Sequence, residues 1–298
     1  MINMMLKYEL IKVFSKRINR LVIVATMLIA IVISCFAIGS IRYVDKDGNL
    51  HTGIAAGRLL ARNQNEWQGK ITPEELSKII KEYKVLLNKY SGDIPNTEYG
   101  KTVQSYYELK DLVVNILNPD SEWDESVLYQ LTDEQLKDIY TIYQENMKKM
   151  AAEYGTTPEK RSFLEQKYKE VKLPFNYEGK EAWETMTMYA QTYVLLLAVV
   201  IGFLTAGIFS AEFRPGAEDI FFASRYGRSK AVKNKILAGV IMSTIVYWVG
   251  ACILSFIAFY VMGTSGFFTP YQIDDPYSIY ILTFGEYYLL ILVSGYVA

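Results

Sequence analysis

Residues that could carry metal or nucleophilic chemistry are few in this chain. It contains one histidine, His51, and two cysteines, Cys35 and Cys252. A transition-metal site needs several His, Cys or carboxylate side chains at ligand spacing, and the sequence presents no such cluster. A Ser-His-Asp arrangement could form only through His51 in a loop, and no G-x-x-x-x-G-K-S/T segment is present to bind the phosphates of ATP. We therefore expect no catalytic residue, no cofactor and no metal ion, and a protein that is not itself an enzyme.

The most informative polar segment is a short, mixed-charge stretch, residues 212–235. Pro215-Gly216 interrupts it, a short helix can form over residues 218–224, and Gly227-Arg228 ends that helix. Phe221 and Phe222 lie on the short helix, and exposed aromatic side chains are typical of a docking surface. The alternative is a helix that lies on a membrane with its aromatic rings in lipid.

The elements that must position this segment are three uncharged apolar runs, residues 21–41, 185–211 and 236–262. Each is long enough to cross a bilayer as a helix, which needs about 20 residues. They predict an α-helical membrane protein with these runs as spans 1 to 3. The first run could instead be a cleaved signal peptide, although its apolar core is longer than such peptides usually have.

Three smaller features accompany these runs. Both cysteines fall inside them, so we expect buried, unreactive thiols and no disulfide framework. Residues 287–298 form a shorter apolar run, which we interpret as the start of a truncated fourth span. Residues 1–20 predict a cytoplasmic amphipathic helix at the membrane interface, or a plain basic flank that only sets orientation.

The distribution of charge in the short segments predicts the topology. Lys and Arg dominate before the first run and between the second and third runs, whereas residues 263–286 contain neither. Short segments rich in Lys and Arg stay in the cytoplasm. The amino terminus and residues 212–235 are therefore predicted inside, and residues 42–184 and 263–286 outside. The net charge of −1 offers no basic face for nucleic acid.

The long segment 42–184 predicts a mostly helical extracellular domain with a core of its own. Thr72 and Glu75 can close a capping box around Pro73, and similar signals precede two later helices. Residues 41–44 before Asp45-Lys46-Asp47-Gly48 could start a hairpin. The predicted helices begin near residues 72, 106, 132 and 157. Their tyrosines are either core residues or the walls of a ligand groove.

The loop pattern resembles the coupling loop of ABC-2 type transporter permeases. The matching positions, together with the two aromatic residues between them, are Glu212, Arg214, Gly216, Phe221, Phe222, Ser224, Gly227, Arg228 and Lys235. The opening residues 6–12 resemble that family's interfacial elbow helix. A first span, a large external domain, a second span and a coupling loop are similar to the layout of such permeases in low-GC Gram-positive bacteria.

The resemblance implies a membrane subunit of an exporter in a bacterial plasma membrane, with six spans in the intact protein. It implies two partners besides the lipid, a separate ATPase subunit and a second permease subunit. Glu212, Arg214 and Arg228 would make polar contacts or brace the loop, and Phe221 and Phe222 would fill a groove of the ATPase. The alternative is a membrane-anchored sensor or scaffold whose external domain binds a peptide or cell-wall component.

Overall fold

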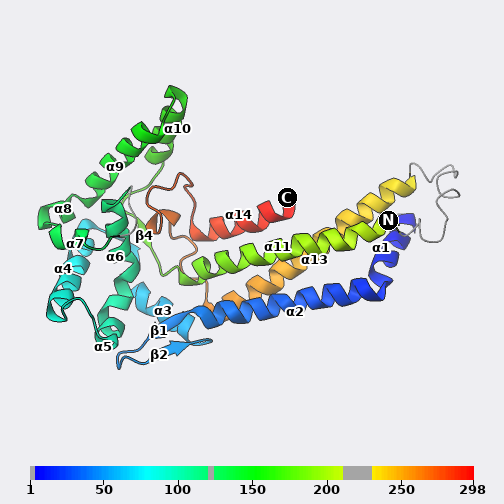
Figure 1. Ribbon diagram of the computed structural model, residues 1–298, viewed down its shortest axis with the longest axis horizontal. Coiled ribbons are helices and arrows are strands. Elements are labelled where there is room, and N and C mark those ends of the chain that lie inside the picture. Colours follow the sequence, from blue (N-terminus) through cyan, green and yellow to red (C-terminus); the bar gives the residue numbers. More distant parts are fainter. Residues whose placement is uncertain (1–3, 120–123, 211–229) are drawn as a thin grey trace. The chain divides into compact units, whose positions relative to one another are not determined.

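The computed structural model describes residues 4–119, 124–210 and 230–298, and it is mostly helical (Figure 1). The chain divides into two compact units. Unit 1 comprises Met1–Ala37, Met186–Phe259 and Leu290–Ala298, and unit 2 comprises Ile38–Thr185 and Tyr260–Leu289. Unit 2 therefore combines in one compact body two segments that are predicted as separate, the domain 42–184 and the loop 263–286.

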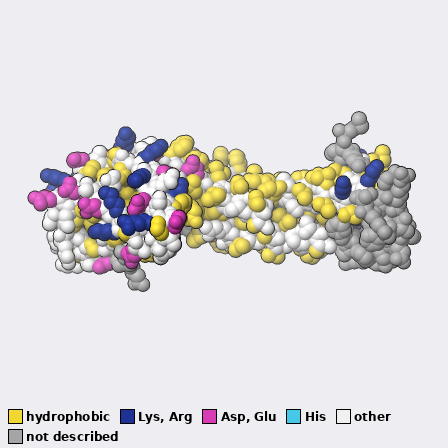
Figure 2. All heavy atoms as spheres, turned by 90° about the horizontal axis from the view of Figure 1, so that it is seen from above, with side chains coloured by type: hydrophobic (Ala, Val, Ile, Leu, Met, Phe, Trp, Pro, Cys, Tyr) yellow, Lys and Arg dark blue, Asp and Glu magenta, His cyan; other side chains and the backbone are white. Residues whose placement is uncertain are grey.

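Unit 1 is built from the long apolar helices. The helices that supply it are α1 (Met4–Ser15), α2 (Arg17–Ser40), α11 (Glu181–Ser210), α13 (Val232–Met262) and α14 (Phe284–Val297). Three of them, α2, α11 and α13, are long and apolar enough to cross a membrane, whereas α14 is shorter. Figure 2 shows hydrophobic side chains covering the surface of these helices, while charged side chains gather over the other unit.

Each long helix begins four residues before the predicted span, at 17, 181 and 232 instead of 21, 185 and 236. The apolar runs were delimited by charge, but a charged residue such as Arg20 or Glu184 can remain helical and extend its side chain toward water. For the same reason residues 17–20 belong to α2, and the predicted interfacial helix 1–20 ends at Ser15.

Tyr193 links the three long helices of unit 1. Its hydroxyl donates a hydrogen bond to the carbonyl oxygen of Thr26 on α2, at 3.2 Å. On α13 it lies against Gly250, where a Cβ atom would collide with the hydroxyl. Ser34 on α2 likewise donates to the carbonyl oxygen of Leu254 on α13, at 3.1 Å. Small residues at such crossings let helix backbones approach closely, as is common in membrane bundles.

The two cysteines do not lie where we expected them. Cys35 on α2 and Cys252 on α13 are free thiols whose side chains are exposed on the outer faces of their helices. An apolar run predicts a helix but does not predict which of its faces packs against a neighbour, because both faces are hydrophobic.

Among its described residues, unit 2 contains two small antiparallel pairs of strands and a set of short and medium helices. The first pair, β1 (Arg42–Val44) with β2 (Leu50–Thr52), is the predicted hairpin, and the second joins β3 (Gly69–Lys70) to β4 (Asn176–Tyr177). The α-helices are α3 (Ala56–Gln64), α4 (Pro73–Lys89), α5 (Asn96–Glu98), α6 (Gln104–Leu117), α7 (Val127–Gln130), α8 (Asp133–Lys137), α9 (Ile139–Tyr154) and α10 (Pro158–Lys169). Shorter helical turns are η1 (Asn65–Trp67), η2 (Tyr99–Val103) and η4 (Tyr271–Ile273).

Three of the four predicted helix starts in unit 2 are confirmed by their caps. Thr72 and Glu75 form the capping box of α4, with Pro73 at its first position. Thr132 and Gln135 do the same for α8, and the Thr157 side chain accepts a hydrogen bond at the start of α10. These signals depend only on neighbouring residues, so they can be recognised without knowledge of the tertiary structure.

The core of unit 2 is formed mainly by α4, α6 and α9, and tyrosines are prominent in it. Tyr106, Tyr143 and Tyr177 are each at most 1% exposed, so these tyrosines are core residues. Ile273 of the segment 260–289 packs into the same core. The hydroxyl of Tyr143 donates to the carbonyl oxygen of Pro276, which fastens that segment to α9.

Candidate functional site

The candidate site in unit 1 begins with α1, an amphipathic helix with a charged residue on its buried face. Leu6, Glu9 and Val13 are the buried positions, spaced three and four residues apart, so they share one side of the helix. Glu9 is 8% exposed. A carboxylate between two aliphatic side chains is costly unless a cation and hydrogen bonds compensate its lost hydration.

Lys235 supplies that cation. It lies in the first turn of α13 and is 1% exposed, with Ala231 and Ala238 on the same buried face. Its Nζ lies 3.1 Å from Oε2 of Glu9. The other carboxylate oxygen, Oε1, lies 3.1 Å from Nζ of Lys12, which is half exposed. The buried carboxylate is therefore shared between one buried and one exposed ammonium group.

The same lysine also holds the end of α11. Lys235 Nζ donates to the carbonyl oxygen of Ile208, at 3.4 Å, and Lys16 Nζ donates to that of Gly207, at 3.3 Å. The last turn of a helix presents unpaired carbonyl groups and a partial negative charge, which cations stabilise. We name Glu9, Lys235 and the Ile208 carbonyl the three-helix clamp, because they join α1, α13 and α11.

A sharp corner between α1 and α2 directs the first helix to this place. The chain bends at Lys16, and Asn19, itself buried, donates from Nδ2 to the carbonyl oxygen of Val13 at 2.8 Å. This bond satisfies a carbonyl group at the end of α1. The corner is therefore part of the packed structure of unit 1.

The predicted coupling-loop residues divide into two groups. Lys235 is described, and the structure places it in the clamp, buried and paired, instead of on an exposed loop surface. The other predicted positions lie outside the described residues, namely Glu212, Arg214, Gly216, Phe221, Phe222, Ser224, Gly227 and Arg228. Sequence reasoning missed Glu9, because the local pattern of residues 1–20 does not show that this acidic residue shares the buried face with Leu6 and Val13.

A second cluster, in unit 2, corrects the expectation that no acidic cluster has metal-ligand spacing. Carboxylate oxygens of Glu108, Glu181 and Glu184 lie within 4.8 Å of one another. The cluster was missed because Glu108 is distant in sequence from the other two and is brought to them by folding. Lys180 Nζ already supplies a positive charge there, 3.7 Å from Glu108 and 3.5 Å from Asp274.

The electrostatics of this cluster follow from burial. Burial raises the pKa of Glu108 to about 7, with Glu181 and Glu184 adding to the shift and Lys180 opposing it. Burial alone would lower the pKa of Lys180, but the neighbouring carboxylates of Glu108, Glu184 and Asp274 raise it well above its ordinary value. Lys180 therefore stays charged, and Glu108 titrates near neutral pH.

Comparison of the chain with protein-family models, curated protein sequences and solved structures gave no match.

Proposed function

We propose that this chain is the membrane-spanning permease subunit of an ATP-driven exporter of the ABC-2 type. A separate ATPase subunit would hydrolyse ATP, and two permease subunits would form the pathway in a bacterial plasma membrane. Spans without charged residues are compatible with a peptide or a lipophilic molecule as the cargo. The observation that carries the proposal is the three-helix clamp.

The clamp supports coupling for a mechanical reason. Residues 211–229 connect α11 to α13, and the clamp joins the end of α11, the start of α13 and α1. A displacement of the connecting loop would therefore move three helices as one body. An ATPase that binds the loop differently in its two nucleotide states would shift the permease between two conformations by that difference in affinity.

Two further observations agree with this function. The 298 residues contain no P-loop motif, which agrees with a separate subunit that hydrolyses ATP. The segments 42–184 and 263–286, both predicted outside, belong to the same compact unit. Segments that pack on one core must lie on the same side of a membrane, which agrees with the predicted topology.

The test is co-purification of the tagged chain from membranes of its native host, with the partner identified by its sequence as a P-loop ATPase. The variant Phe221→Asp with Phe222→Asp should abolish the association. The matched control is Tyr154→Asp with Phe163→Asp, which alters two exposed aromatic residues in unit 2. ATP-dependent export should be lost with the first variant and kept with the control. Unchanged association of the first variant would refute docking through the loop.

The second candidate is a membrane-anchored sensor or scaffold. It is favoured by the size of unit 2, which has a hydrophobic core of its own and a cavity of about 550 Å³ beside it. Reconstitution separates the two functions, because an exporter transports cargo with ATP whereas a sensor does not.

A further inference from the structure

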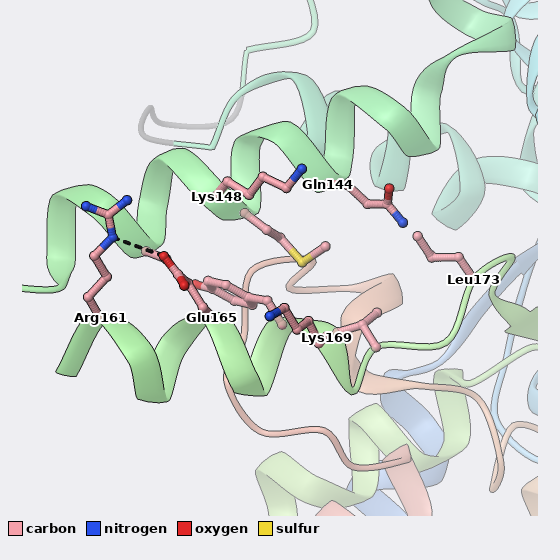
Figure 3. Close-up of a pocket in the computed structure, with 10 residues that line it drawn as sticks. Gln144, Lys148, Arg161, Glu165, Lys169 and Leu173 are labelled. Carbon is pink, nitrogen blue, oxygen red and sulfur yellow. Dashed lines mark hydrogen bonds and ion pairs between the residues drawn. The ribbon is translucent and has the colours of Figure 1, made fainter. Parts of the chain in front are cut away.

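The cavity in unit 2 lies between α9 and α10, which form an antiparallel pair of helices (Figure 3). Gly155 ends α9 at the turn between them, where a Cβ atom would collide with the Ala151 carbonyl oxygen and with Arg161. The close turn holds the two helices side by side. The cavity of about 550 Å³ is within the range of sites that bind small molecules.

The floor of the cavity is apolar. Met147 and Tyr168 are buried, and Val171 and Leu173 contribute aliphatic surface beyond the end of α10. The Tyr168 hydroxyl donates a hydrogen bond to the carbonyl oxygen of Tyr277, at 3.3 Å. A ligand in the cavity would therefore contact the aromatic ring of Tyr168 and not its hydroxyl group.

The rim of the cavity carries an excess of positive charge. Arg161 and Glu165 on α10 form an ion pair, with Nε and Oε1 3.0 Å apart. Lys148 on α9 and Lys169 on α10 also line the cavity and are exposed, and neither has an ion-pair partner among the described residues. Figure 3 shows these side chains extending from the two helices around the space between them.

We propose that this cavity binds a single-chain amphiphile with a carboxylate head group. The alkyl chain would lie on the floor formed by Met147, Tyr168 and Leu173, and the carboxylate would lie between Lys148 and Lys169. An opposite charge on the ligand complements two lysines that have no acidic partner in the described structure. This site is independent of the loop and of the exporter function proposed above.

The walls of the cavity favour an alkyl chain over an extended peptide. α9 and α10 satisfy their main-chain N–H and C=O groups within each helix, so they offer no row of partners for a peptide backbone. An alkyl chain needs no hydrogen bonds and gains from contact with the apolar floor.

The experiment uses the full chain in nanodiscs of zwitterionic phosphatidylcholine and radiolabelled octanoate in equilibrium dialysis, with empty nanodiscs subtracted. We expect saturable binding of octanoate, binding of butanoate weaker by about tenfold or more, and no saturable binding of octyltrimethylammonium. Equal binding of the cationic amphiphile would overturn the proposal.

Variants locate the site. Lys148→Glu with Lys169→Glu should weaken octanoate binding by about tenfold or more. The matched control is Lys149→Glu with Lys160→Glu, which makes the same charge change at exposed lysines of α9 and α10 that do not line the cavity. Equal loss in both variants, or none in the first, would refute the site. Saturable binding of N-acetyl-trileucine in the absence of octanoate binding would overturn the assigned ligand class.

Discussion

Nζ of Lys235 lies 3.1 Å from Oε2 of Glu9, and both side chains are buried although 226 positions separate them in the chain. The pair joins an amino-terminal helix to the helix that follows the predicted coupling loop. It makes the amino-terminal helix part of the same packed body as the ends of α11 and α13.

Removal of the lysine charge should destabilise unit 1. Among the described residues, Lys235→Met leaves Glu9 with the half-exposed Lys12 as its ionic partner. Loss of one member of a buried ion pair costs about 3–5 kcal/mol. The apparent Tm in neutral detergent should fall by several degrees. Lys233→Met, at an exposed position of the same helix, is the control and should leave Tm unchanged. A Tm of Lys235→Met equal to that of the control would show that the pair contributes little.

The crossing of α11 and α13 gives a double-mutant test. Gly250→Ala should destabilise by about 1–3 kcal/mol, because its methyl group meets the Tyr193 hydroxyl. Tyr193→Phe alone should cost about 1 kcal/mol by removing the bond to Thr26. The double variant should be more stable than Gly250→Ala alone, since the clash is gone. Gly202→Ala is the control, because no atom lies within 4 Å of a Cβ atom added there. If the stability losses of the two single variants, measured by thermal unfolding, add up to the loss of the double variant, the contact between residues 250 and 193 is contradicted.

The stability of unit 2 should depend on pH through Glu108. Its pKa is raised to about 7 in the folded state, mainly by burial, so the folded state holds the proton more tightly than the unfolded state does. Its stabilising contribution is complete below the ordinary carboxyl pKa of about 4.5 and is lost as pH rises through about 7. Glu108→Gln, which mimics the protonated form, should remove this dependence. If the Tm of the unaltered protein and the Tm of Glu108→Gln change with pH in the same way from pH 5 to 8, Glu108 is not the group that causes the dependence.

The segment 260–289 should be held to unit 2 by Tyr143. Tyr143→Phe removes the hydrogen bond to the Pro276 carbonyl group while keeping the buried ring. We expect a loss of about 1 kcal/mol and faster amide hydrogen exchange in residues 271–280, measured by mass spectrometry. Tyr129→Phe, at a residue that is 57% exposed, is the control. Exchange in residues 271–280 that matches this control would show that the bond does not hold the segment.

Cysteine labelling tests the topology. In a background with Cys35 and Cys252 replaced by alanine, Lys160→Cys should react with a membrane-impermeant maleimide in intact cells. Lys233→Cys should react only after lysis, because we place the start of α13 in the cytoplasm. Both positions are exposed. Labelling of residue 233 in intact cells would exclude a cytoplasmic ATPase partner at this loop.

The sequence alone determined the features that depend on neighbouring residues. Apolar runs longer than a bilayer predicted the helices α2, α11 and α13, and side-chain caps predicted the starts of α4, α8 and α10. Such signals act over a few residues or along one continuous run, so no knowledge of distant contacts is needed.

Only the tertiary structure decided which distant residues meet. It paired Glu9 with Lys235, gathered Glu108, Glu181 and Glu184 around Lys180, and packed the segment after α13 into the core of unit 2. It also exposed Cys35 and Cys252, because a uniformly hydrophobic helix carries no signal for which side will be covered. Local patterns specify elements, whereas the partners of a buried charge depend on how the elements pack, which no periodicity in the chain encodes.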